Sequence, residues 1–286
     1  TNVMNASDAL DYFFILQKLR YGCMQANYGK VFSQSYHLFL LEEILDYVEK
    51  IELEEHPLIK GSYRALMLFR NPENETYFNK LRDVLTSYNS SFSEIVNIEL
   101  YRFAQNYCIG KVNSGSKNYL EKLFEIYDET LNNKVALING ELSHVSFKNI
   151  VAIACSLEKY DWVENFITEF GSSLPEAQKE NSIAINTALL YWHKRRLSDA
   201  VRLLSRVEFD DPFYALNAKS LLLKIYFEQD EKEVLLSFCE SFKVYLRRNK
   251  LISKSHINNY SNLISYTSKL IKLKPSQVEK FTKIKE

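Results

Sequence analysis

The stretch "ALLYWHKRRLSDAVRLLSRVEFDDP" (188–212) contains two apolar patterns separated by the polar turn "HKRRLS". On both sides of this turn, apolar residues recur at spacings of three and four, which is typical of amphipathic helices. The first pattern carries small Ala188 and aromatic Tyr191, the second begins with small Ala200, and Pro212 ends the stretch. We therefore predict two helices that pack as an antiparallel hairpin.

The same pattern recurs on both sides of this stretch. An offset of 37 residues places Pro212 under Pro175 and leaves every compared core position apolar, with Ala188 under Val151, Ala200 under Val163, Leu204 under Ile167 and Val207 under Phe170. An offset of 35 residues places Tyr226 under Tyr191, Leu235 under Ala200 and Phe242 under Val207. Such a period predicts successive hairpins that bury their apolar faces by stacking.

Over residues 145–248 the chain resembles the tetratricopeptide repeat, a helix-turn-helix of about 34 residues with small and aromatic residues on the first helix, an alanine on the second and a closing proline. It departs from the family pattern at Arg195, where a glycine is usual, and at Val207, which replaces the last alanine. The resemblance implies a right-handed α-solenoid whose concave groove is lined by the first helix of each pair.

The rest of the chain also reads as helical. Only 7 glycines and 5 prolines occur among 286 residues, too few for the many tight turns of a β-rich protein, and no stretch is predicted to be a strand. We expect an all-α fold, a stack of antiparallel helix hairpins in one solenoid, with divergent hairpins in 1–140 and tetratricopeptide-like repeats in 141–286. About fourteen helices are predicted, at 7–26, 35–50, 57–70, 75–88, 92–110, 117–132, 144–158, 160–170, 175–193, 197–207, 212–228, 231–248, 254–273 and 275–284.

Several residues are expected to begin these helices. Ser7, Asn74 and Ser116 suit N-terminal caps, and Pro57, Pro175, Pro212 and Pro275 suit the first turn, where the missing N–H has no intrahelical partner.

Charge and cysteine content limit the function classes. The chain has 36 basic and 36 acidic residues, so its overall field favours neither nucleic acid nor a membrane as a partner. From Lys243 to Glu286, however, there are eleven basic residues and two acidic ones. Cys23, Cys108, Cys155 and Cys239 each lie in an apolar helical pattern and are expected to be small buried residues, which favours a reducing, cytoplasmic location.

No catalytic motif is present. His193 stands alone at a helix end, so we interpret it as a residue near the helix cap or on the surface rather than a general base. No His-x-x-x-His or Cys-x-x-Cys pair occurs, and "GKVNSGSK" (110–117) follows a helix instead of a strand and lacks the residue order of a phosphate loop. We therefore assign no catalytic residue, metal ligand or cofactor, and predict a protein that is not an enzyme.

The tetratricopeptide resemblance instead implies a groove that binds a peptide or protein segment. The positions it places in that groove are Lys148, Asn149, Asn186, Leu189, Trp192, Asn217 and Lys224, together with Ala152, Ile185 and Leu221. Asparagines there could hold a peptide backbone, and Trp192 could supply an anchor pocket.

Other functions remain open from the sequence. The basic C-terminal helices could bind nucleic acid or another anionic ligand, and distant acids and tyrosines could assemble an active site. The chain starts at Thr1 rather than Met, so we expect a piece of a longer protein or a processed form. The ends of a helical stack could also associate with a second copy.

Overall fold

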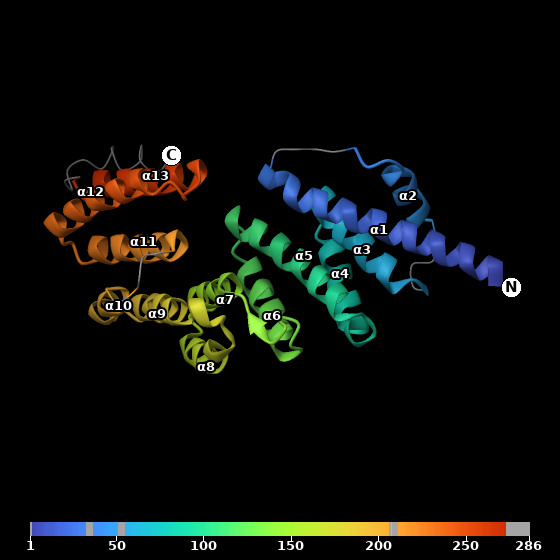
Figure 1. The fold of residues 1–286 in the computed structure, drawn as a ribbon, viewed down its shortest axis with the longest axis horizontal. Helices are drawn as coiled ribbons and strands as arrows, with labels where there is room; N and C mark the ends of the chain where they lie inside the picture. The colour runs from blue at the N-terminus through green and yellow to red at the C-terminus, as the bar shows by residue number, and fades with distance from the viewer. Residues whose placement is uncertain (1, 33–36, 51–54, 206, 208–210, 273–286) are drawn as a thin grey trace. The chain divides into compact units, whose positions relative to one another are not determined.

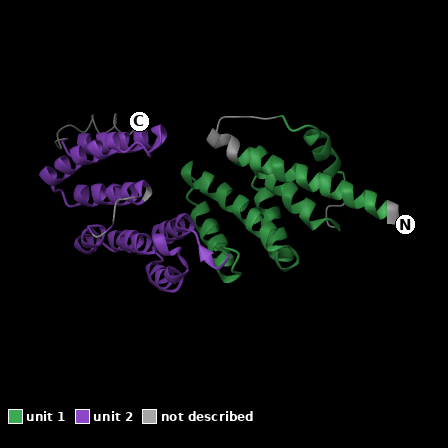
Figure 2. Cartoon of the chain, viewed as in Figure 1, with its two compact units in different colours: residues 1–138 green, residues 139–286 purple. Residues whose placement is uncertain are grey.

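The computed structural model describes residues 2–32, 37–50, 55–205, 207 and 211–272. Within these ranges the chain forms thirteen α helices, connected mostly by short turns (Figure 1). The chain divides into two compact units, residues 1–138 (unit 1) and 139–286 (unit 2) (Figure 2). None of the helices in the described part of the chain is long and apolar enough to span a bilayer.

Unit 1 contains the first six helices. They are α1 (Asn2–Phe32), α2 (Leu41–Val48), α3 (Pro57–Arg70), α4 (Thr76–Tyr88), α5 (Glu94–Asn113) and α6 (Tyr119–Asn132), with a 3-10 turn at Asn89–Ser91. α3 packs against α1, α2, α4 and α5, and α6 packs against α5. Gly22 allows the close approach of α1 and α3, because a Cβ atom there would lie 2.9 Å from Leu66 Cδ2. An ion pair of 2.6 Å between Arg20 and Glu99 ties α1 to α5.

Unit 2 contains the remaining seven helices of the described chain. They are α7 (His144–Ser156), α8 (Tyr160–Phe170), α9 (Glu176–His193), α10 (Leu197–Leu204), α11 (Pro212–Glu228), α12 (Lys232–Arg248) and α13 (Lys254–Leu270), with a 3-10 turn at Gly171–Ser173. α7 packs against α9, α9 against α11, and α11 against α13, while α8, α10 and α12 each pack against the helices before and after them. The first helices of successive hairpins therefore form one continuous layer (Figure 1).

The three hairpin turns of unit 2 have the same backbone structure. Glu158, Arg195 and Asp230 each adopt a left-handed conformation, with φ of 58°, 61° and 55°. The next residue in each turn donates its N–H five residues back, from Lys159 to Ala154, Arg196 to Tyr191 and Glu231 to Tyr226. These positions are separated by the same 37 and 35 residues that the apolar pattern predicts, so the structure is compatible with a helical repeat.

Apolar residues at the compared positions of the repeat pattern lie in the core. Val151, Val163, Ala188, Ala200 and Leu235 are all fully buried. Ala188 and Ala200 lie in the same apolar cluster, which brings α9 and α10 together. The predicted spacing of core positions is therefore confirmed at these residues.

Some predicted element ends were wrong. α1 begins at Asn2, so Ser7 lies inside the helix and does not cap it. Pro175 precedes α9 as its N-cap residue, whereas Pro57 and Pro212 are the first residues of their helices. Asn74 does accept a hydrogen bond of 3.1 Å from Thr76 N, at the start of α4.

Residues 137–142 contain a structure that the sequence pattern did not predict. Two short strands, β1 (Leu137–Ile138) and β2 (Glu141–Leu142), form a two-stranded sheet. Gly140 and Asn139 between them have positive φ, as a tight hairpin turn requires. The predicted helix 275–284, with Pro275, lies outside the described residues.

Candidate functional site

Two of the predicted groove residues are hydrogen-bonded to each other. Lys148 on α7 donates from Nζ to Asn217 Oδ1 on α11, over 3.2 Å. Both side chains are half-buried, and burial lowers the pKa of Lys148. Because α7 and α11 both pack against α9, this bond joins the two helices on either side of α9.

Further polar side chains near the start of α7, α9 and α11 also contact one another. His144 Nδ1 lies 2.5 Å from Gln178 Oε1, which links α7 to α9. Ser182 Oγ lies 2.9 Å from Tyr214 OH, which links α9 to α11. The rings of His144 and Tyr214 are 5.8 Å apart. The N-terminal halves of α7, α9 and α11 are therefore joined by side-chain contacts.

A pocket of about 470 Å³ opens beside this pair. Its wall includes Lys148, the start of α11 with Asp211 and Asn217, and the segment 251–260 with Leu251 and Tyr260. Lys148 supplies donors, Asp211 supplies acceptors, and Leu251 and Tyr260 supply apolar surface. The pocket can therefore hold a ligand that has both polar backbone groups and an apolar side chain.

A second pair of predicted groove residues meets farther along α11. Lys224 Nζ lies 5.3 Å from the centroid of the Trp192 ring. Trp192 Nε1 is buried and has no hydrogen-bond partner among the described residues. Lys224 follows Asn217 by seven residues, so the two lie on the same side of α11, about 10 Å apart along its axis.

Other predicted groove positions belong to the core. Asn186 is only 2% exposed, and its Nδ2 donates to Ser182 O over 2.8 Å. Ile185 and Leu221 are also buried, and Leu189 packs against the same apolar cluster. The placement of Asn186, Ile185 and Leu221 on an open groove surface was therefore wrong. Asn149 and Ala152 on α7 are half-buried.

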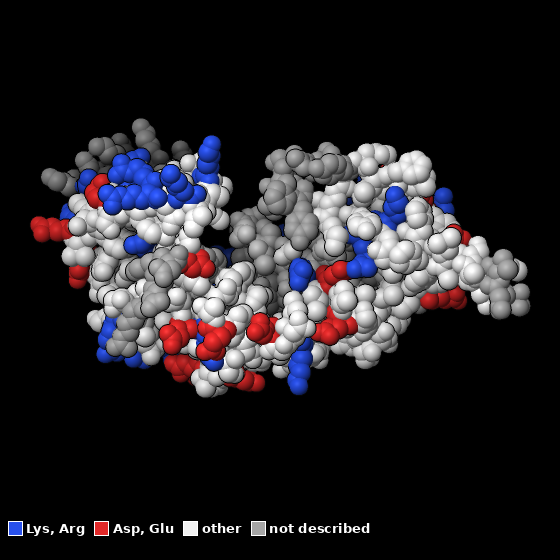
Figure 3. All heavy atoms as spheres, viewed as in Figure 1, with Lys and Arg blue, Asp and Glu red and all other residues white. Residues whose placement is uncertain are grey.

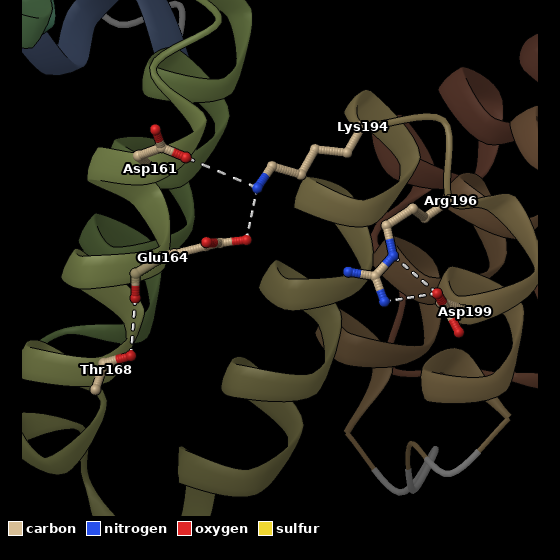
Figure 4. A network of polar contacts seen from close by, with 6 residues as sticks. All are labelled: Asp161, Glu164, Thr168, Lys194, Arg196 and Asp199. Atoms are coloured by element: carbon tan, nitrogen blue, oxygen red, sulfur yellow. Dashed lines mark hydrogen bonds and ion pairs between the residues drawn. The ribbon is translucent and has the colours of Figure 1, made fainter.

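The charged turn after α9 has a structural role (Figure 4). Lys194 Nζ lies 2.6 Å from Glu164 Oε1 and 4.0 Å from Asp161 Oδ1, which ties α9 to α8. Arg196 pairs with Asp199 at 2.7 Å at the start of α10. "HKRRLS" is the turn between α9 and α10, as the sequence predicts, and its Lys194 links this hairpin to α8.

His193 ends α9 beside aromatic rings. Its ring centroid is 4.7 Å from that of Trp192 and 6.4 Å from that of Tyr160. Burial and the charge of Lys224 lower its pKa, against an opposing effect of Glu228. These surroundings favour the neutral imidazole over the charged form.

The sequence did not point to the pocket residues Leu251, His256 and Tyr260, because they lie in a hairpin turn and helix outside the repeat motif. Within the described ranges, no three or more His, Cys, Asp or Glu side chains gather in a way that could hold a metal ion.

Comparison of the chain with protein-family models, with curated proteins and with solved structures finds no match. The function of the site is therefore inferred from its own geometry.

Proposed function

We propose that unit 2 is a right-handed, tetratricopeptide-like α-solenoid that binds an extended peptide or protein segment, without catalysis. The observation that carries this proposal is the pocket beside the Lys148–Asn217 hydrogen bond. It combines donors, acceptors and apolar surface at one point on the layer of first helices. An extended peptide presents the complementary groups, since its backbone carries N–H and C=O groups and its side chains alternate on either side.

The distance between the two pairs of contacting residues also fits an extended peptide. Lys148–Asn217 and Trp192–Lys224 are about 10 Å apart along α11, which corresponds to about three residues of extended chain. If one apolar side chain of the peptide lies between Leu251 and Tyr260, the peptide residue three positions farther along would reach the Trp192 ring. An aromatic ring that is already in place loses little conformational entropy on binding.

The test is a selection of random peptides displayed on phage against the full chain. Selected peptides are then measured by calorimetry against the parent, Lys148→Glu and Tyr260→Ala. Lys232→Glu is the matched control, because Lys232 is exposed on α12 and does not line the pocket.

We expect the selected peptides to share an apolar residue and to bind the parent with a micromolar Kd. They should bind Lys148→Glu and Tyr260→Ala at least about tenfold more weakly than the parent. Lys232→Glu should bind them as the parent does. Failure to enrich any peptide, or peptides that bind all four proteins equally, would overturn the proposal. Circular dichroism spectra confirm that each variant is folded.

A further inference from the structure

The hairpin of α12 and α13 carries a strongly basic surface. Seven basic residues and no acidic residue occur between Lys243 and Lys272. Six of the seven are exposed, namely Arg247, Arg248, Lys250, Lys254, Lys269 and Lys272. Figure 3 shows basic side chains gathered over α12 and α13. We call these six residues the basic surface.

The basic surface extends over both helices. Lys254 and Lys269 are about four turns apart and lie within roughly 60° of each other around α13. α12 and α13 pack against each other as consecutive helices of a hairpin. Consistent with this, Lys243, Arg247 and Lys272 all lower the pKa of Glu240, chiefly through the hydrogen bond that Lys243 donates to it. The positive charges of α12 and α13 therefore add to each other on the same part of the surface.

An exposed apolar side chain lies among these basic residues. Leu251 lies in the turn between α12 and α13 and is 82% exposed, the highest value among the large exposed apolar residues of the described chain. Arg247, Arg248 and Lys250 precede it, and Lys254 follows it. The turn is fixed, because Leu251 N donates to Asn249 Oδ1 over 3.0 Å and Ser253 Oγ caps α13 by accepting from His256 N.

We propose that the α12–α13 hairpin docks on the surface of a bilayer that contains anionic lipid, with Leu251 inserted and the basic surface against the headgroups. Basic residues near such a surface each contribute about 1 kcal/mol, and an apolar side chain gains further by leaving water for the acyl region. A nucleic acid would use the charges but offers no hydrocarbon for Leu251. The apolar tip therefore favours the membrane over the nucleic acid that the basic sequence alone also allows.

This proposal does not depend on the peptide-binding function. Leu251 also lines the pocket, but Arg247, Arg248 and Lys250 do not. Charge reversal at these three residues therefore tests membrane docking while leaving the pocket intact. The overall charge of zero does not oppose membrane docking, because the attraction between the basic surface and anionic headgroups is local and decays within a Debye length.

The test is flotation of the full chain with vesicles of phosphatidylcholine alone or with about 30% phosphatidylserine. The variants are Arg247→Glu/Arg248→Glu/Lys250→Glu and Leu251→Ser. Their matched controls are Lys80→Glu/Arg102→Glu/Lys117→Glu, the same change of charge at three exposed residues of unit 1, and Ile95→Ser at an exposed apolar position of α5.

We expect the parent to float only with vesicles that contain phosphatidylserine, and less as salt is raised. The triple charge reversal should weaken binding by at least about 100-fold and Leu251→Ser by about tenfold, while both controls bind like the parent. Absence of binding at low salt, equal loss in the matched controls, or retention of single-stranded RNA without vesicle binding would overturn the proposal.

Discussion

Glu158 and Arg195 occupy equivalent places in two successive hairpins of unit 2. Each is the second residue after the first helix of its hairpin, and each has a left-handed backbone, with φ of 58° and 61°. Many helices end with glycine at this place, because a Cβ atom disfavours positive φ. Both turns thus have the geometry of a glycine turn without the glycine.

Replacement of Glu158 by glycine should therefore stabilise unit 2. Glu158 is exposed, so its loss removes little packing, and glycine relieves the left-handed strain. We expect the free energy of unfolding to rise by about 0.5–1 kcal/mol. The measurement is urea unfolding followed by tryptophan fluorescence, which reports on unit 2 alone because both tryptophans, Trp162 and Trp192, lie in it.

The control for this change is Glu180→Gly. Glu180 is exposed within α9, where glycine is unfavourable, so the same substitution should lower the free energy of unfolding by about 0.5–1 kcal/mol. Destabilisation by both substitutions would show that the turn at Glu158 is not strained.

Ala188 should not tolerate a larger side chain. It is fully buried between α9 and its neighbours, and leucine there would displace the helices or force side chains from their preferred rotamers. We expect Ala188→Leu to lower the free energy of unfolding by about 1–3 kcal/mol. Ala177→Leu, at an exposed position of the same helix, should change it by less than about 0.5 kcal/mol. Similar values for the two variants in urea unfolding would contradict the packing described here.

The four cysteines should be unreactive in the native protein. All are buried and free, and burial raises the pKa of Cys23, of Cys108 to about 12 and of Cys155 to about 12. Because the thiolate is the reactive species, we expect no rapid reaction with Ellman's reagent in buffer and complete reaction in concentrated guanidinium. Rapid labelling of any thiol in buffer, located by peptide mapping, would show that its helix is accessible.

The hairpins of unit 2 could be predicted from sequence, because core positions such as Ala200 and Leu235 repeat at helical spacing and are decided locally. The exposed side of α9 could be predicted only in part. α9 packs against α7, α8, α10 and α11, so most of its circumference is covered and Asn186 falls inside the core. Which side of a helix stays open depends on how many neighbours it has, and a repeat motif does not give that number. The pocket also needs Tyr260 from α13, a helix that carries no motif position.

His193 should make the stability of unit 2 depend on pH. Burial first, and then the charge of Lys224, lower the pKa of His193 from its ordinary value of 6.5, while Glu228 opposes them and the other near neighbours are the rings of Trp192 and Tyr160. The unfolded chain therefore binds a proton at a higher pH than the folded chain does. The stabilisation is complete above pH 6.5 and is lost as the pH falls through 6.5 towards the lower folded pKa.

His193→Gln removes this dependence, so the free energy of unfolding of the parent should fall relative to that of the variant between about pH 7.5 and about pH 5.5 in urea unfolding series. Parallel curves for the two proteins would mean that the pKa of His193 is the same in both states, and a parent that gains stability as the pH falls would mean that Glu228 outweighs burial and Lys224.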